Sequence, residues 1–291
     1  MHFTISKTSL RIAAAAGVLF IHSLSQAAGS RLPATGGVMQ LEGSAGGGLV
    51  PWALIAGLGS RNEVGGSAFC TRVEPQDFSL NSCGVALGLR DRVEVSYARQ
   101  DFDLGTTVPG YSIQQHVVGV KVKVAGDAVY DQDRWLPQIA VGVQHKTNED
   151  HDVVPRLLGA RDDSDNDYYV AATKLWLSGI AGRSTLLSVT LRATRANQLG
   201  ILGFGGDNQD SYQLQPEMSV GVFVHDKLVL GAEYRAKPDN LRVFEEDDFM
   251  DVYLAWIPAK FVSVTLAYAD LGNIADKPDQ RGWYASLQGS F

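Results

Sequence analysis

Segments of about ten residues in which apolar and polar side chains alternate recur through most of the chain, and they constrain its fold more than any other feature. In residues 186–194, Leu187, Val189 and Leu191 share one face of an extended strand, and the polar residues between them share the other. The same alternation occurs at 92–101, 118–124, 139–143, 213–222 and 262–268. After residue 28, no stretch is long and apolar enough to cross a bilayer as a helix. If the chain lies in a membrane, strands must cross it.

The one long apolar run lies at the N-terminus. Lys7 and Arg11 lead into an apolar stretch over residues 12–21, which is followed by small residues up to Ala28. A basic segment, an apolar segment and a small-residue cleavage site together indicate a secretory signal. The apolar run is shorter than the roughly 20 residues of a spanning helix. We therefore predict a cleaved signal peptide over residues 1–27 and one mature domain over residues 28–291.

The net charge argues against nucleic acid as a partner. The whole chain has a formal charge of −7, and cleavage removes two cations and no acid, which leaves −9. An acidic protein has no general electrostatic attraction to a phosphate backbone.

The connections between the segments alternate in length. Short ones lie at 90–92, 181–183, 225–227 and 258–260, and long polar ones lie at 147–166, 197–210, 237–248 and 271–281. The connection at 126–136 is the exception, since it is longer than a tight turn but falls on the short side. Membrane barrels have short periplasmic turns and long extracellular loops. The pattern therefore predicts a transmembrane, antiparallel, up-and-down β-barrel that ends on the periplasmic side.

Thirteen strands can be counted back from the C-terminus. They lie near 281–291, 260–270, 248–257, 227–236, 211–224, 184–196, 167–179, 136–146, 113–125, 92–103, 79–89, 64–72 and 52–60. Bacterial barrels have even strand counts, so we predict one more strand near 38–43 and a total of fourteen. The alternative is twelve strands, with the glycine-rich stretch 43–48 and its neighbours folded into the lumen.

The last strand has the features of an assembly signal. Trp283, Leu287 and Phe291 share the apolar face of an alternating segment, and the chain stops on an aromatic residue. This strand resembles the terminal signal that the barrel-assembly machinery of Gram-negative bacteria reads. The predicted location is therefore the outer membrane, and the predicted partners are the assembly machinery, outer-membrane lipid and lipopolysaccharide.

Several longer strings resemble a known family. They are residues 126–142 (GDAVYDQDRWLPQIAVG), 191–207, 231–241, 270–275 and 282–288, and the likeness extends over nearly the whole mature chain. The chain is similar in them to a family of proteobacterial outer-membrane proteins that is labelled as a domain of unknown function. The resemblance implies a barrel but provides no activity and no functional residues.

No catalytic set stands out in the sequence. The one histidine-containing cluster, residues 145–152, opens a predicted extracellular loop, and we interpret it as a solvated loop rather than a metal or protease site. The sequence around Gly203 to Gly206 lacks the ending of a phosphate loop and is expected to form a tight external loop. We predict no enzyme, no cofactor and no metal. The acidic residues at 149–167 and 245–248 are expected to be solvated extracellular loops.

The two cysteines, Cys70 and Cys83, flank a predicted hairpin tip near residues 74–78. The outer membrane faces oxidising compartments. A disulfide is favoured over two free thiols, although pairing Phe69 outward with Val85 would shift the register by one residue.

Charged residues are expected to line the lumen once the apolar residues are placed outward. Among them, Arg192 is expected near Glu217, and Glu217 near Arg235. The pore-lining candidates are Glu94, Lys121, Lys123, Lys174, Arg192, Glu217, Glu233 and Arg235.

Two functions fit this lining. The first is a pore for small polar solutes, with cationic positions along its wall. The alternative is a structural or adhesive barrel with a sealed lumen, whose acidic loops bind cations, lipopolysaccharide or a partner.

Overall fold

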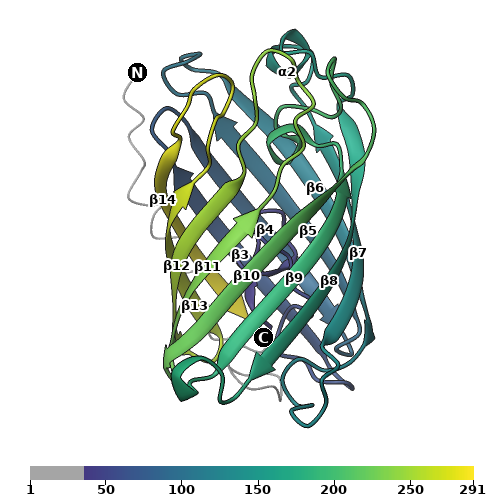
Figure 1. Cartoon of the computed structure of the whole chain (residues 1–291), viewed down its shortest axis with the longest axis vertical. Helices are drawn as coiled ribbons and strands as arrows, with labels where there is room; N and C mark the ends of the chain where they lie inside the picture. The colour runs from purple at the N-terminus through teal and green to yellow at the C-terminus, as the bar shows by residue number, and fades with distance from the viewer. Residues whose placement is uncertain (1–35) are drawn as a thin grey trace, which may run out of the picture.

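The computed structural model describes residues 36–291, which form a closed antiparallel barrel of twelve strands around a short internal segment (Figure 1). Each strand pairs with its neighbours in sequence, and β14 closes the barrel against β3. The predicted signal peptide over 1–27 lies outside the described residues. The strands are β3 (Val64–Glu74), β4 (Ser79–Leu89), β5 (Val93–Asp103), β6 (Ser112–Ala125), β7 (Gln138–Asn148), β8 (Ser164–Trp176), β9 (Thr185–Thr194), β10 (Gln213–His225), β11 (Leu228–Arg235), β12 (Phe249–Ala259), β13 (Val262–Asp270) and β14 (Arg281–Ser290).

The outer surface of the barrel is apolar because the strands alternate as predicted. On β12, Met250, Val252 and Trp256 are 50%, 58% and 51% exposed, while Asp251 and Tyr253 between them are buried. Apolar side chains of the other strands are exposed in the same way, which is the arrangement of a barrel wall that faces lipid. No helix within residues 36–291 has the length and apolarity to cross a membrane.

The prediction of fourteen strands is wrong, and the twelve-strand alternative is confirmed. The segments expected as strands near 38–43 and 52–60 lie inside the barrel, where β1 (Val38–Met39) and β2 (Ala45–Gly46) form a small hairpin (Figure 1). The physical reason is composition. Eight glycines between 36 and 59 weaken any strand, and residues 49–56 are buried in one continuous run rather than on alternating faces. We call residues 36–57 the plug.

The plug enters and leaves at the barrel end where the chain terminates. The main-chain N–H of Leu58 donates to the carbonyl of Phe291 at 2.8 Å, and the N–H of Gly66 donates to the same oxygen at 2.9 Å. This end carries the short connections, including the one with η1 (Ile180–Gly182), and is therefore the periplasmic end. The long loops, which hold α2 (Val154–Leu157) and η2 (Asn197–Gly200), lie at the opposite, extracellular end (Figure 1).

Gly57 is required where the plug leaves the lumen. Its φ is +82°, and a Cβ there would lie 2.3 Å from the nitrogen of Gly66. We expect Gly57→Ala to cost at least about 1–3 kcal/mol, because a non-glycine residue is strained in this conformation and the backbone of β3 leaves no room. The measurement is the urea concentration at which half of the protein is unfolded. It is read from gels in which the folded barrel and the heat-unfolded chain migrate differently. Gly182→Ala is the control, since Gly182 has φ +72° but nothing within 4 Å of a Cβ. Equal losses in the two variants would contradict a role for the close approach.

Cys70 and Cys83 are direct cross-strand partners on β3 and β4 and form a disulfide on the outer face of the wall. Phe69 points inward, with 3% of its surface exposed, so the alternative register with Phe69 outward is not adopted. The disulfide joins two strands near the extracellular end of their hairpin. It covalently fixes a pairing that the hydrogen-bond ladder already makes.

Candidate functional site

The lumen is the candidate site, because every predicted pore-lining side chain points into it. Each of these residues is at most 6% exposed, and the set consists of Glu94, Lys121, Lys123, Lys174, Arg192, Glu217, Glu233 and Arg235. They do not border open space at the level of the plug. Most of them instead hold the plug or one another.

Glu42, at the tip of the plug, lies in the middle of the largest charge network. Its carboxylate pairs with Arg235 at 2.7 Å, with Lys146, and with Arg192 at 3.7 Å. Burial by itself would raise the pKa of Glu42, but the three neighbouring cations outweigh burial and lower this pKa below its usual range. Glu42 is therefore ionised, and it joins the plug to strands β7, β9 and β11.

The wall supplies the remaining members of this network. Arg192 pairs with Glu217 at 2.5 Å and with Asp167 at 3.2 Å, and Glu217 also lies 3.4 Å from Arg235. Lys146 pairs with Asp167 at 2.6 Å. Both expected pairs, Arg192 with Glu217 and Glu217 with Arg235, are present. Three carboxylates thus meet three cations, which is the condition under which buried charges are tolerated.

A second polar contact shapes the plug itself. The ammonium of Lys121 donates to the carbonyls of Ala45 and Leu54 at 2.9 and 2.7 Å and pairs with Glu94 at 3.0 Å. Glu94 accepts hydrogen bonds from the N–H groups of Ala45 and Ala56 at 3.1 and 2.9 Å. One ion pair of the wall therefore satisfies main-chain groups on both arms of the plug.

Lys123 and Lys174 lie near the periplasmic connection between β6 and β7, away from the plug tip. Lys123 pairs with Asp91 at 2.8 Å and with Asp127 at 3.4 Å. Lys174 donates to the carbonyls of Asp131 and Arg134. Both lysines support this connection and differ in role from the residues that hold the plug.

The extracellular end is covered by the loop that contains η2. The carbonyl of Leu199 accepts hydrogen bonds from Lys146 at 3.0 Å and from Gln115 at 3.1 Å. Leu202 and Phe204 have no exposed surface, so the stretch expected as a tight external loop folds inward over the lumen. The plug and this loop together fill the barrel from both sides.

A second extracellular loop secures that cover. Glu246 accepts a hydrogen bond from Gln198 of η2 and pairs with Lys237 at 2.9 Å. Burial lowers the pKa of Lys237 and raises that of Glu246, and in each case the charge of the partner opposes the effect of burial. This pair belongs to the cover and not to the plug.

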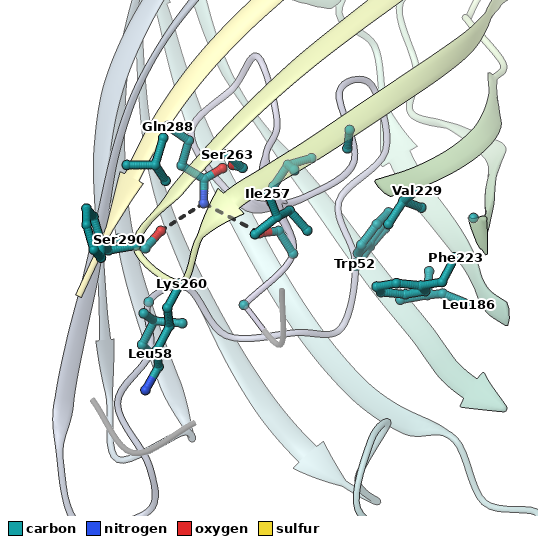
Figure 2. Close-up of a pocket in the computed structure, with 18 of the residues that line it drawn as sticks. Trp52, Leu58, Leu186, Phe223, Val229, Ile257, Lys260, Ser263, Gln288 and Ser290 are labelled. Atoms are coloured by element: carbon teal, nitrogen blue, oxygen red, sulfur yellow. Dashed lines mark hydrogen bonds between the residues drawn. The ribbon is translucent and has the colours of Figure 1, made fainter. Parts of the chain in front are cut away.

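The base of the plug contacts the wall through apolar groups. A cavity of about 60 Å³ lies between the plug base and strands β9–β14. In Figure 2, Trp52 of the plug faces Leu186, Phe223 and Val229 of the wall. Gln288 of β14 donates to Ser290 of the same strand at 3.0 Å and to the carbonyl of Gly37 at 3.4 Å, and the second bond ties the base to the last strand. The plug thus has an apolar base and a charged tip.

The histidine cluster at 145–152 does not assemble as a unit. His151 lies in the extracellular loop, and no group of three or more His, Cys, Asp or Glu side chains within 36–291 could hold a metal ion. On the outer face of β7, however, Thr147 Oγ1 lies 3.4 Å from His145 Nε2. His145 Nδ1 lies 3.1 Å from Asn166 Oδ1 on β8. A hydroxyl, an imidazole and an amide are therefore in series at the extracellular end of the wall.

The sequence reasoning missed two acids of the central network. Glu42 was assigned to a wall strand, and Asp167 was grouped with the acidic loop that precedes β8. For Asp167 the sequence contains a signal for the inward direction. It lies two and four residues before Tyr169 and Ala171, so it shares the face of the strand on which their side chains are buried. Glu42 carried no such signal, because its partners lie as far away in sequence as Arg235.

Comparisons with known proteins give one family and several solved structures. The family described as "Protein of unknown function (DUF3034)" matches residues 35–288. No curated protein matches the chain. Among solved structures, the NanC porin has a TM-score of 0.49 and 9% identity, over 78% of this chain and 98% of that chain. An outer-membrane channel from Pseudomonas putida F1 has a TM-score of 0.42 and 9% identity, over 83% of this chain and 96% of that chain.

A further similar structure corrects one prediction. The outer-membrane phospholipase A of Escherichia coli has a TM-score of 0.41 and 11% identity, over 78% of this chain and 91% of that chain. The prediction that the chain is not an enzyme is contradicted by this likeness to an enzyme. At such identities a likeness concerns the fold alone and assigns no activity. The closed barrel places the protein in the outer membrane, and the family match over residues 35–288 shows that it belongs to the DUF3034 family.

Proposed function

We propose that the protein is a gated channel for small polar solutes and that the plug is its gate. The observation that supports this is the chemistry of the plug tip. Glu42 is held by charged side chains of the wall, and Lys121 holds the plug main chain through hydrogen bonds. These wall groups would line a water-filled path if the tip moved away. If apolar side chains held the tip instead, its departure would expose an apolar wall, which excludes polar solutes.

The energetics of such a contact favour a reversible gate. Charges in a dry network lose their hydration, so a buried ion network contributes little net stability compared with apolar packing. When the tip leaves, water replaces Glu42 as a partner of the wall cations and the exchange costs little. The apolar base, with Trp52 against Val229, stays in place as the anchor of the plug (Figure 2).

The test is a removable lock between the plug and the wall. A Cβ at Gly43 would lie 3.2 Å from the Cβ of Ala98, close to the roughly 3.5–4.5 Å between Cβ atoms in disulfides. Gly43 has φ +89°, so a cysteine there is strained, but the reduced and oxidised forms of the same protein share this strain. Gly43→Cys with Ala98→Cys is made in a background with Cys70→Ser and Cys83→Ser. We expect single-channel current steps in planar bilayers from the reduced form, silence after oxidation, and steps again after dithiothreitol.

The controls separate gating from misfolding. The background without the lock should conduct regardless of dithiothreitol. Silence of both redox forms, from protein that migrates as folded in gels, would contradict the channel and favour a structural or adhesive barrel with a sealed lumen. In that case deletion of residues 149–165 should abolish surface binding to cations, lipopolysaccharide or a partner and spare assembly.

The C-terminal strand supports a separate proposal on assembly. Trp283 and Leu287 are 66% and 59% exposed on the outer face, and the carbonyl of Phe291 accepts two hydrogen bonds at the seam. We propose that the barrel-assembly machinery reads the side chains of Trp283, Leu287 and Phe291 before the seam closes. Phe291→Ala should reduce the amount of barrel in outer-membrane fractions several-fold and leave refolding in detergent unchanged. Equal losses of barrel in the outer-membrane fraction and of refolding in detergent would indicate that Phe291 acts only in closure of the barrel.

A second candidate function is acyl-ester hydrolysis at the outer face, which rests on Thr147, His145 and Asn166. A nucleophile, a base and an orienting group in hydrogen-bond series is the arrangement that activates a hydroxyl. Thr147 Oγ1 would attack an ester carbonyl while His145 Nε2 takes its proton and passes it to the departing alcohol. Water, deprotonated by His145, would then hydrolyse the acyl-threonine, and the proton would return to Thr147. A lipid ester fits, because the side chains lie on the lipid-facing side of β7.

Release of fatty acid from mixed phospholipid–detergent micelles tests this candidate. Thr147→Val and His145→Asn should each lower the rate by about 10²-fold or more, and Thr147→Ser should retain it. His225→Asn, at the periplasmic end of β10, is the matched control. Release that is unchanged in Thr147→Val would exclude this hydroxyl as the nucleophile.

A further inference from the structure

Glu233 and Asp251 form an unusual pair in the wall of the lumen. They are direct cross-strand partners on β11 and β12, and both point inward, with 3% and 5% of their surfaces exposed. Side chains in such positions lie within about 4.5–5.5 Å of each other at Cβ, and like charges placed there destabilise a sheet. Two neighbouring buried carboxylates therefore need either a bound cation or a proton that removes one of the charges.

Within residues 36–291 no lysine, arginine or histidine forms an ion pair with either carboxylate. The other buried acids of the lumen each meet a cation. Glu42, Asp167 and Glu217 meet the three cations of the central network, and Glu94 meets Lys121. Glu233 and Asp251 thus carry a formal charge of −2 that the described side chains leave uncompensated.

Three buried oxygen atoms in this part of the lumen lack a hydrogen-bond partner. Glu233 Oε1 and Asp251 Oδ1 are buried and have no hydrogen-bond partner among the described residues, and the same holds for the hydroxyl of Tyr284. Glu233 Oε1 lies over Gly47 of the plug and Tyr284 lies over the adjacent Gly48, close to where their Cβ atoms would be. The Tyr284 hydroxyl comes from β14, on a different part of the wall, so it is an observation independent of the acidic pair.

We propose that Glu233 and Asp251 bind one divalent, oxygen-preferring cation of the Ca²⁺ class, with the hydroxyl of Tyr284 as a further oxygen ligand. One such ion cancels the charge of −2. Calcium accepts carboxylate and hydroxyl oxygens in flexible geometry, and no lysine, arginine or histidine among the described residues pairs with either carboxylate. The site does not depend on whether the lumen conducts.

The ion would also bind the plug to the wall indirectly. Glu233 Oε2 accepts a hydrogen bond from the N–H of Leu49 at 2.7 Å, so the carboxylate that holds the ion also holds the plug tip. An ion that fixes Glu233 therefore fixes this bond. Removal of the ion leaves two repelling carboxylates beneath the plug.

The experiment compares the refolded full chain in detergent with CaCl₂ and with EDTA. The wild type should bind about one Ca²⁺ by calorimetry and unfold at a higher temperature in CaCl₂. Asp251→Asn and Glu233→Gln should each weaken Ca²⁺ binding at least about tenfold. In EDTA, Asp251→Asn should be the more stable protein, because the repulsion is gone, and in CaCl₂ the wild type should be the more stable one.

One control variant and two outcomes that would overturn the proposal complete the design. Asp152→Asn changes a loop carboxylate whose side chain is 85% exposed, and it should keep the wild-type response to Ca²⁺. The same Ca²⁺ response in Asp251→Asn would place the ion elsewhere and overturn the proposal. Absence of a Ca²⁺ response in the wild type would overturn it as well, and stabilisation by acid alone would then indicate a shared proton.

Discussion

Glu42→Ala is expected to release the plug tip while the barrel stays folded. Removing the carboxylate leaves Lys146, Arg192 and Arg235 buried with two acids instead of three. Breaking a buried charge network from one side costs about 3–5 kcal/mol. This cost falls on the plugged form, since the cations regain water once the tip leaves. At about 1.4 kcal/mol for each factor of ten, the ratio of plugged to open protein should fall by about 10²-fold or more.

Proteolysis and conductance measure this release. Leu41 and Leu49, which lie near the plug tip, are 3% and 1% exposed, so chymotrypsin, which also cuts after leucine, should cut there much faster in Glu42→Ala than in the wild type. Open time in planar bilayers should rise in parallel, and Glu42→Gln, which retains the side-chain shape, should have a smaller effect. Glu245→Ala removes an exposed loop carboxylate and serves as the control. Cleavage that is unchanged in Glu42→Ala would show that the apolar base alone holds the plug.

The wall of the barrel was predictable because its physics is local. A strand between lipid and a polar interior must alternate, so each of the twelve strands shows its orientation in its own sequence. The same alternation along each strand predicts that Arg192, Glu217 and Arg235 point inward. These three residues also lie on consecutive strands, which explains why their pairing followed from the strand order alone.

The plug was not predictable in the same way. Its glycines remove the strand preference, but its residues are apolar enough to resemble a wall strand, as in Trp52 to Ala56. Its charged tip acts through contacts that span the chain, such as the pair of Glu42 with Arg235. No local pattern encodes such a contact. The even strand count allowed both twelve and fourteen, and the choice depended on how the glycine-rich stretch packs.

Arg192→Leu should destabilise the barrel itself, and the size of the loss should depend on the plug. Arg192 is 1% exposed and holds Glu217 and Asp167 of the wall. In the full chain these two acids stay buried when the arginine is removed, so we expect a loss of about 3–5 kcal/mol. In a chain that lacks residues 38–56, water enters the lumen and hydrates both acids. The loss should then fall to the roughly 0–1 kcal/mol of an exposed ion pair.

Urea unfolding of the four proteins in this cycle, followed by gel mobility, gives the coupling between the plug and the wall. A difference of several kcal/mol between the two backgrounds is expected, because burial by the plug is what makes the network costly to break. If Arg192→Leu lowers the free energy of unfolding equally in the two backgrounds, the wall residues are already dehydrated in the protein that lacks the plug. The lumen would then be too narrow for water at this level, and withdrawal of the tip could not open a polar path. The same cycle therefore tests the network and the gate together.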